Sequence, residues 1–224
     1  MIRKIELGDR ITDKTEKGER KDIKRITKTG EKKAQKILGY NHLIKYEIEF
    51  KENEYVNKKM RGVTGRIREC EEAEIKVVIW MDPSVEDWRK GLKTIVPHET
   101  AHTRFYISKG KHYSKYMKWE RLLNEGLAQI VAEKAEPEID NWWRTEYSRK
   151  EIGEKWRTVK KELKKYVDFE EMPLFFGDGE KFPDAFGYSI AYRIGKKLLK
   201  KHELNKFHKI TREEAFQTGD DLFT

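Results

Sequence analysis

The pattern of hydrophobic and polar positions changes its period along the chain. In the first part, three stretches have strand character: residues 43–50 (LIKYEIEF), 62–70 (GVTGRIREC) and 74–81 (EIKVVIWM). The link between the second and third is short, which favours antiparallel pairing. Before them, residues 13–38 have apolar positions at helical spacing and stop at Gly39, a frequent helix terminator. The first part therefore predicts one amphipathic helix followed by a small sheet.

From Asp87 onward the apolar positions follow the period of a helix. The clearest stripe, at i, i+3, i+4, i+7, i+8, i+11 and i+12, consists of Trp119, Leu122, Leu123, Gly126, Leu127, Ile130 and Val131. Further helices are expected at about residues 149–166 and 187–201. Between them, residues 173–187 form a loop rich in Gly, Pro and aromatic residues that could border a cleft.

A sheet followed by helices predicts an α+β fold. We expect a basic helical segment at residues 1–40 and one domain at 41–224. Within that domain the sheet part covers about residues 41–86 and the mostly helical part about 87–224. The role of the basic segment stays open among a propeptide, a lid and an element of the fold.

The composition adds expectations about stability and location. Charged residues make up 40% of the chain, yet six Trp, ten Tyr and ten Phe can supply a core. Both charge signs are abundant and Gln is rare, which predicts ion-pair networks and a thermophilic source. The charged start MIRKIELGDR and the lack of a long apolar run predict a cytoplasmic protein with no membrane partner.

The net charge of +9 is concentrated at the N-terminus, where residues 1–36 hold 13 Lys and Arg against 7 Asp and Glu. A basic arm of this kind can hold the phosphates of a nucleic acid. Because acidic residues are interleaved with the basic ones, a solvated helix face is the favoured interpretation.

A metal-binding motif lies in the stretch IVPHETAHTRF, residues 95–105. His98 and His102 are four residues apart, so on a helix their imidazoles share one face and can bind one Zn²⁺. Glu99 projects about 100° round the helix, where it can reach a metal-bound water. With Cys70 as the single cysteine, a multi-cysteine zinc site is excluded.

A catalytic zinc ion usually takes three protein ligands, and the candidate for the third is Glu125 in WERLLNEGLAQI. It lies on the predicted helix with the clearest stripe, far enough from His102 for a turn and an antiparallel return. Asn124 adjoins it, and the small Ala128 and Ala132 on its side would let two helices approach closely.

HETAH followed by NEGLA resembles the gluzincin metallopeptidases. With the later FGYSIAYRIG, the chain resembles the predicted Zn-dependent protease family of the YjaZ type, over roughly residues 74–200. The resemblance implies a zincin-like fold, zinc held by His98, His102 and Glu125, and hydrolysis of a peptide or protein substrate with Glu99 as general base.

Two positions depart from the gluzincin pattern. Thermolysin-like members have an Asp four residues after the ligand Glu, where this chain has Gln129; its amide oxygen could still accept the imidazole N–H. Pro97 directly precedes His98 and cannot complete the helical hydrogen bond to the carbonyl of Lys93. The helix is therefore expected either to begin near Thr94 or to kink at Pro97.

The oxyanion that develops during peptide hydrolysis needs a donor besides the metal. The resemblance to gluzincins, several of which use a tyrosine here, makes Tyr188 the first candidate and Tyr192 the second. By analogy, an extended substrate would pair with residues 74–81 at the edge of the sheet.

A competing hypothesis is a zinc-stabilised binding protein without peptidase activity, associated with nucleic acid through its basic N-terminal segment. A third combines the two, with a peptidase directed to nucleoprotein substrates. The sequence does not indicate the cleavage specificity or the oligomeric state.

Overall fold

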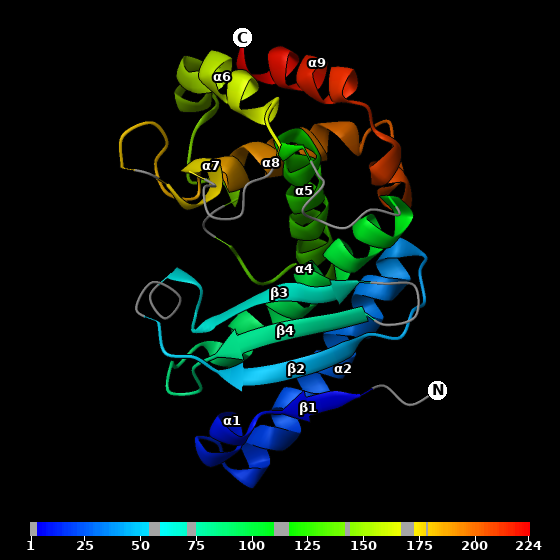
Figure 1. The fold of residues 1–224 in the computed structure, drawn as a ribbon, viewed down its shortest axis with the longest axis vertical. Coiled ribbons are helices and arrows are strands. Elements are labelled where there is room, and N and C mark those ends of the chain that lie inside the picture. Colours follow the sequence, from blue (N-terminus) through cyan, green and yellow to red (C-terminus); the bar gives the residue numbers. More distant parts are fainter. Residues whose placement is uncertain are drawn as a thin grey trace. The chain divides into compact units, whose positions relative to one another are not determined.

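The computed structural model describes residues 4–53, 59–70, 75–109, 117–141, 144–166, 173–177 and 179–224. The chain divides into two compact units: Met1–Ile107 with Val131–Ile139, and Ser108–Ile130 with Asp140–Thr224. The first unit contains the sheet and the second is built mainly of helices (Figure 1). The predicted α+β class is therefore confirmed.

Among the described residues up to 107, the first unit consists of four strands and three helices. In chain order its elements are β1 (Ile5–Leu7), α1 (Asp9–Asp13), α2 (Lys17–Leu38), β2 (Lys45–Phe50), β3 (Val63–Cys70), β4 (Ile75–Met81) and most of α4 (Trp88–Lys109). The sheet has the order β1-β2-β4-β3, with β3 antiparallel to β4 and the other pairs parallel. The three predicted strands and the antiparallel pair are confirmed, whereas β1 was not predicted.

One face of this sheet is packed against α2 and α4, which lie behind it in Figure 1. Alternate strand residues such as Tyr46, Ile48, Val77 and Ile79 are fully buried. The opposite face is charged, and on it Glu47 pairs with Lys76 at 2.8 Å and with two further cations. In β2 the period of two thus separates buried from charged positions, whereas in β4 Val78, opposite Glu47, is also fully buried.

The basic N-terminal segment is an element of the fold of this unit. β1 pairs with β2, and α2 buries its apolar side while ending at Gly39 in the left-handed conformation (φ 58°). A Cβ at Gly30 would lie 3.0 Å from Val96 and 3.2 Å from Pro97, so α2 touches α4 closely. The sequence left the role of this segment open among a propeptide, a lid and an element of the fold. The structure shows that it is an element of the fold.

α4 begins at Trp88 and contains Pro97 in its interior. Of the two alternatives predicted from the sequence, the start near Thr94 is therefore wrong, and the helix continues through Pro97. A proline removes one backbone hydrogen bond and contacts the preceding turn. Burial of the segment from Thr94 to Thr103 against the rest of the unit is the tertiary interaction that outweighs this local preference.

The second unit contains α5 (Lys118–Ala135) up to Ile130, together with the later helices. These are α6 (Arg149–Leu163), α7 (Pro173–Phe176), α8 (Phe186–Leu198), the 3-10 helix η3 (Leu204–Lys209) and α9 (Arg212–Phe223). A Cβ at Gly126 would lie 2.5 Å from the carbonyl oxygen of Ala191, so α5 and α8 cross at close range. The predicted long helices are confirmed.

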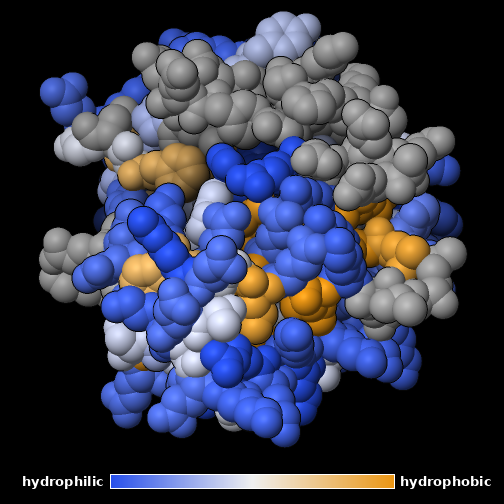
Figure 2. Space-filling view, turned by 60° about the horizontal axis from the view of Figure 1, so that its bottom comes forward, coloured by the Kyte–Doolittle hydropathy of each residue, from blue (hydrophilic) through white to orange (hydrophobic). Residues whose placement is uncertain are grey.

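The surface is strongly polar. Hydrophilic residues predominate in the view of Figure 2, with apolar patches between them. In the part of the chain that the structure describes, no helix has the length and apolar character needed to cross a membrane.

Candidate metal centre

His98 and His102 lie one turn apart on α4, and both side chains are buried. Their Nε2 atoms are 3.1 Å apart, with the two rings nearly perpendicular. The spacing of four residues brings them to one face of the helix. The helix therefore directs two imidazole nitrogens at one point.

Glu99 completes a cluster with these histidines. Its carboxylate oxygen and the two ring nitrogens all lie within 4.8 Å of one another, and its side chain is buried. Among the described residues this is the group of His, Cys, Asp and Glu that could hold a metal ion.

The donor atoms fit zinc. Two nitrogens bound to a tetrahedral zinc at about 2.05 Å would be about 3.3 Å apart. The observed 3.1 Å between His98 Nε2 and His102 Nε2 is close to this value. Neutral imidazole is a preferred zinc ligand, and a buried position protects it from competition by water.

Gly65 on β3 lies directly against Glu99. It is opposite Ile79 in the β3–β4 register, so it is on the buried face of the sheet. A Cβ at this position would lie 2.7 Å from Cγ of Glu99 and 3.3 Å from its Oε1. Glycine weakens a strand and often marks a close approach; here it leaves room for the Glu99 carboxylate.

A buried polar layer holds α4 from the side of β2 and α2. The Thr100 hydroxyl donates to the carbonyl of Val96 at 2.6 Å and so accepts from Tyr46 at 2.7 Å. In the same way, Thr103 donates to the carbonyl of Thr100 and accepts from Tyr40.

Burial raises the pKa of Tyr46 well above its usual value, which keeps its hydroxyl protonated as a donor. This layer could not be predicted from the sequence, because a tyrosine and a threonine in distant elements have no recognisable spacing.

Glu125 and its neighbour Asn124 are buried on α5 in the second unit. Glu125 forms an ion pair with Arg121, one turn earlier on the same helix. A buried carboxylate requires such charge compensation. The ion pair shows how the fold of this unit accommodates Glu125.

Gln129 and Tyr188 are joined within the second unit. Nε2 of Gln129 donates to the backbone carbonyl of Tyr188 at 3.0 Å. This orients the amide, and its buried Oε1 has no hydrogen-bond partner among the described residues. Oε1 of Gln129 therefore remains able to accept a hydrogen bond, as the predicted support of a zinc-bound histidine requires.

Both candidate tyrosines lie on α8 and are partly exposed. The ring of Tyr188 meets Phe175 edge-on at 5.3 Å between centroids. Tyr192 faces two cations, Arg144 and Lys196, at 5.9 and 5.6 Å from its ring centre.

The predicted site residues thus fall into two groups. The first unit brings together His98, Glu99 and His102. The second unit carries Glu125 with Asn124, Gln129 and Tyr188. That these groups form one metal centre stays a prediction.

The prediction that an extended substrate pairs with residues 74–81 at the edge of the sheet is wrong. β4 pairs with β2 on one side and with β3 on the other, so it has no free edge for a peptide. Its continuous apolar run reflects burial at the centre of the sheet. Among the described strands, the edges are β1 and β3.

An α+β fold with a buried His-Glu-His cluster on a helix is typical of zinc-dependent hydrolases. The chain belongs to the family described as "Predicted Zn-dependent protease (DUF2268)", whose model matches residues 30–218. This agrees with the resemblance to the predicted Zn-dependent proteases seen in the sequence. Comparisons with curated proteins and with solved structures gave no match.

Proposed function

We propose that this protein is a zinc-dependent peptidase of the gluzincin type. The observation that carries the proposal is the convergence of His98 Nε2 and His102 Nε2 at 3.1 Å beside the carboxylate of Glu99. Membership of the family described as a predicted Zn-dependent protease supports it. The alternative of a zinc-stabilised binding protein without peptidase activity is not favoured by this family.

The proposed ligands are His98, His102 and Glu125. Three protein ligands leave a coordination position open, as catalysis requires. Support for Glu125 comes from its place in NEGLA, which resembles the second motif of gluzincins, and from its burial on α5; Arg121 compensates its charge when no metal is bound. Gln129, with its remaining amide acceptor, and Asn124 are proposed to support the ligands.

Glu99 is the proposed general base. When bound, zinc would lower the pKa of a water molecule and polarise the carbonyl of the scissile bond. Glu99 would take the proton from the attacking water and deliver it to the leaving amine. Its carboxylate lies near both histidines, and Gly65 leaves the space that it occupies.

Tyr188 is the proposed donor to the oxyanion of the tetrahedral intermediate. Its partly exposed ring could present its hydroxyl to a substrate, and its backbone is fixed by Gln129. Tyr192 is the weaker candidate because its ring lies beneath two cations.

An extended peptide would bind along β3. This strand is at the edge of the described sheet and carries Gly65, which touches Glu99. A free strand edge offers backbone donors and acceptors to a peptide, as in strand addition. The scissile bond would then lie close to the general base.

The experiment is cleavage of a quenched fluorescent peptide library by protein purified without chelator. We expect cleavage that 1,10-phenanthroline abolishes and that added Zn²⁺ restores. Glu99→Gln should keep zinc and lose roughly 10²–10⁴-fold in rate, the usual range for general acid–base catalysis. A zinc-loaded wild type that cleaves no peptide, or a Glu99→Gln variant with full activity, would contradict the proposal.

A further inference from the structure

α2 carries a row of lysines on its outer side, which we call the lysine stripe. Its members are Lys17, Lys21, Lys24, Lys28, Lys32 and Lys36, and all are exposed. They recur every three or four residues, so they lie on one face of the helix. At 1.5 Å per residue the stripe is roughly 28 Å long.

The acidic residues of α2 do not neutralise this stripe. Asp22 pairs with Arg25 at 2.9 Å and with Arg89 at 3.1 Å, and Glu19 lies 3.9 Å from Arg89. Glu31 is fully buried, where Gln35 donates to it. The acids that interleave with lysines in α2 are therefore paired with arginines or buried, and none forms an ion pair with a lysine of the stripe.

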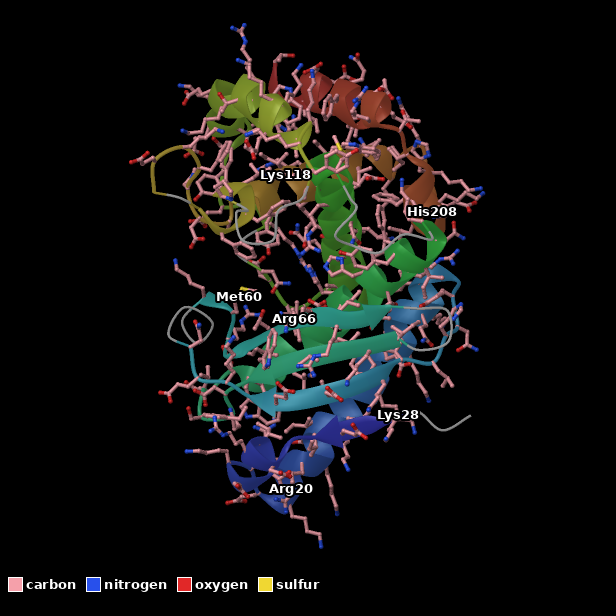
Figure 3. The ribbon with its side chains drawn as sticks, viewed as in Figure 1. Arg20, Lys28, Met60, Arg66, Lys118 and His208 are labelled. Atoms are coloured by element: carbon pink, nitrogen blue, oxygen red, sulfur yellow. The ribbon has the colours of Figure 1, made fainter. Side chains whose placement is uncertain are left out.

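The lysines of the stripe form no ion pair with any residue in the described part of the chain. Lys28 is labelled on α2 in Figure 3, together with Arg20. Arg20 is not part of the stripe. It donates hydrogen bonds to the backbone carbonyls of Thr12 and Thr15 and so joins α1 to α2. The stripe is thus a charged surface whose lysines have no structural partner in the described unit.

We propose that the lysine stripe binds the phosphodiester backbone of nucleic acid without reading its sequence. A nucleic-acid strand is a linear array of single charges spaced about 3.4 Å apart, so a 28 Å stripe faces about eight phosphates. Lysine is a flexible point charge suited to phosphate. The outer face of α2 carries no aromatic ring that could stack on a base, so the contacts position the molecule and do not specify a sequence.

A lipid bilayer is a less suitable partner for the lysine stripe than nucleic acid is. An amphipathic helix on a membrane inserts its apolar side into the lipid. The large apolar side chains Ile23, Ile26 and Leu38 of α2 are buried within the first unit, so they are not free to insert. Binding to lipid would rest on charge alone.

An acidic protein surface also fits less well. Protein interfaces are depleted in lysine and enriched in arginine and aromatic residues. The stripe is made of lysine, and the arginine beside it, Arg25, is paired with Asp22. Its length and uniform charge match a regular polyanion better than a folded partner.

The test measures binding of a fluorescent random-sequence 30-base-pair DNA duplex by anisotropy, between 50 and 200 mM salt. If six lysines each neutralise one phosphate, the slope of log K against log salt is roughly −5, a loss of about 10³-fold over this range. The variant Lys21→Gln/Lys24→Gln/Lys28→Gln/Lys32→Gln keeps good helix formers and should reduce the slope to roughly −2.

The matched control replaces four exposed lysines of the second unit: Lys150, Lys161, Lys164 and Lys201, each by Gln. Both variants lower the net charge by the same amount, from +9 to +5 (9 − 4 = 5). The control should keep a slope within about one unit of wild type.

Three outcomes would overturn the proposal. The first is no binding of the duplex at 50 mM salt. The second is a control variant that loses as much binding as the stripe variant, which would indicate that net charge alone is responsible. The third is tighter binding of phosphatidylserine vesicles or of polyglutamate than of the duplex, which would assign the stripe to lipid or to acidic protein. Because no peptide substrate is used, the result does not depend on the peptidase proposal.

Discussion

Replacing Gly65 by alanine tests whether β3 sets the position of the general base. The new Cβ would lie 2.7 Å from Cγ of Glu99 and 3.2 Å from its Cδ. Ordinary carbon contacts are about 3.5–4.0 Å. The Glu99 side chain must therefore move by roughly 1 Å, or β3 must shift by a similar amount.

The expected effect falls on the rate more than on metal binding. A displacement of about 1 Å in a catalytic group can cost on the order of 10²-fold. We expect kcat/KM to fall by roughly 10–100-fold, which corresponds to about 1.4–2.7 kcal/mol. Zinc content should not change, because the new Cβ meets Glu99 and neither histidine among its nearest atoms. Overpacking should also lower the free energy of unfolding by about 1–3 kcal/mol.

Gly91→Ala is the matched control. Its Cβ would meet the carbonyl oxygen of Arg61 and Cγ2 of Val63, each at 3.0 Å, so it crowds the same unit away from Glu99. We expect a comparable loss of thermal stability with near-normal kcat/KM for a quenched peptide. A folded, zinc-loaded Gly65→Ala variant with wild-type kcat/KM would refute the assignment of a positioning role to Gly65.

Further predictions concern other groups of the molecule. Tyr188→Phe should lower kcat by about 10²–10³-fold with little change in KM, whereas Tyr192→Phe should leave kcat near wild type; the reverse result would exchange their roles. Burial raises the pKa of Glu162, but hydrogen bonds from Lys118 and two other lysines outweigh it and lower the pKa from 4.5 to about 2. The resulting stabilisation is complete above pH 4.5 and is lost as the pH falls towards 2, so acid should reduce the Tm of wild type more steeply than that of Glu162→Gln. Gly126→Ala should lower the Tm of the protein, because its Cβ would lie 2.5 Å from the backbone oxygen of Ala191; an unchanged Tm would contradict this packing.

The sequence predicted those features that depend on local periodicity. The i, i+4 spacing placed His98 and His102 on one face, and the apolar stripe marked α5. The alternation of residues marked β2 and β3. Each of these signals is contained in a single element, so no knowledge of the tertiary structure was required.

Features that depend on tertiary structure were missed or wrong. The apolar run of β4 indicates burial and does not show which strand lies at the edge, so the substrate edge was misplaced. Pro97 predicted either a helix start near Thr94 or a kink, and the first alternative is wrong because packing outweighs the local preference of proline. The contact between Gly65 and Glu99 joins two distant elements, and a single glycine in a strand does not reveal its partner.

Three predictions from the sequence are tested neither by the fold nor by the family. The single domain beginning at residue 41, the cytoplasmic location and the thermophilic source stay predictions from composition and pattern. A melting curve of the purified protein tests the last of these: a midpoint in the range of about 45–65 °C, usual for mesophiles, would contradict it.

The central claim is that His98, His102 and Glu125 hold one zinc ion, and its most direct test is zinc stoichiometry by elemental mass spectrometry. We expect about one zinc per chain in wild type and in Glu99→Gln, and loss of zinc in Glu125→Ala. Glu120→Ala is the control, because Glu120 is another buried carboxylate on α5; it should retain zinc. Wild type without zinc, or Glu125→Ala with a full complement of zinc, would contradict the account.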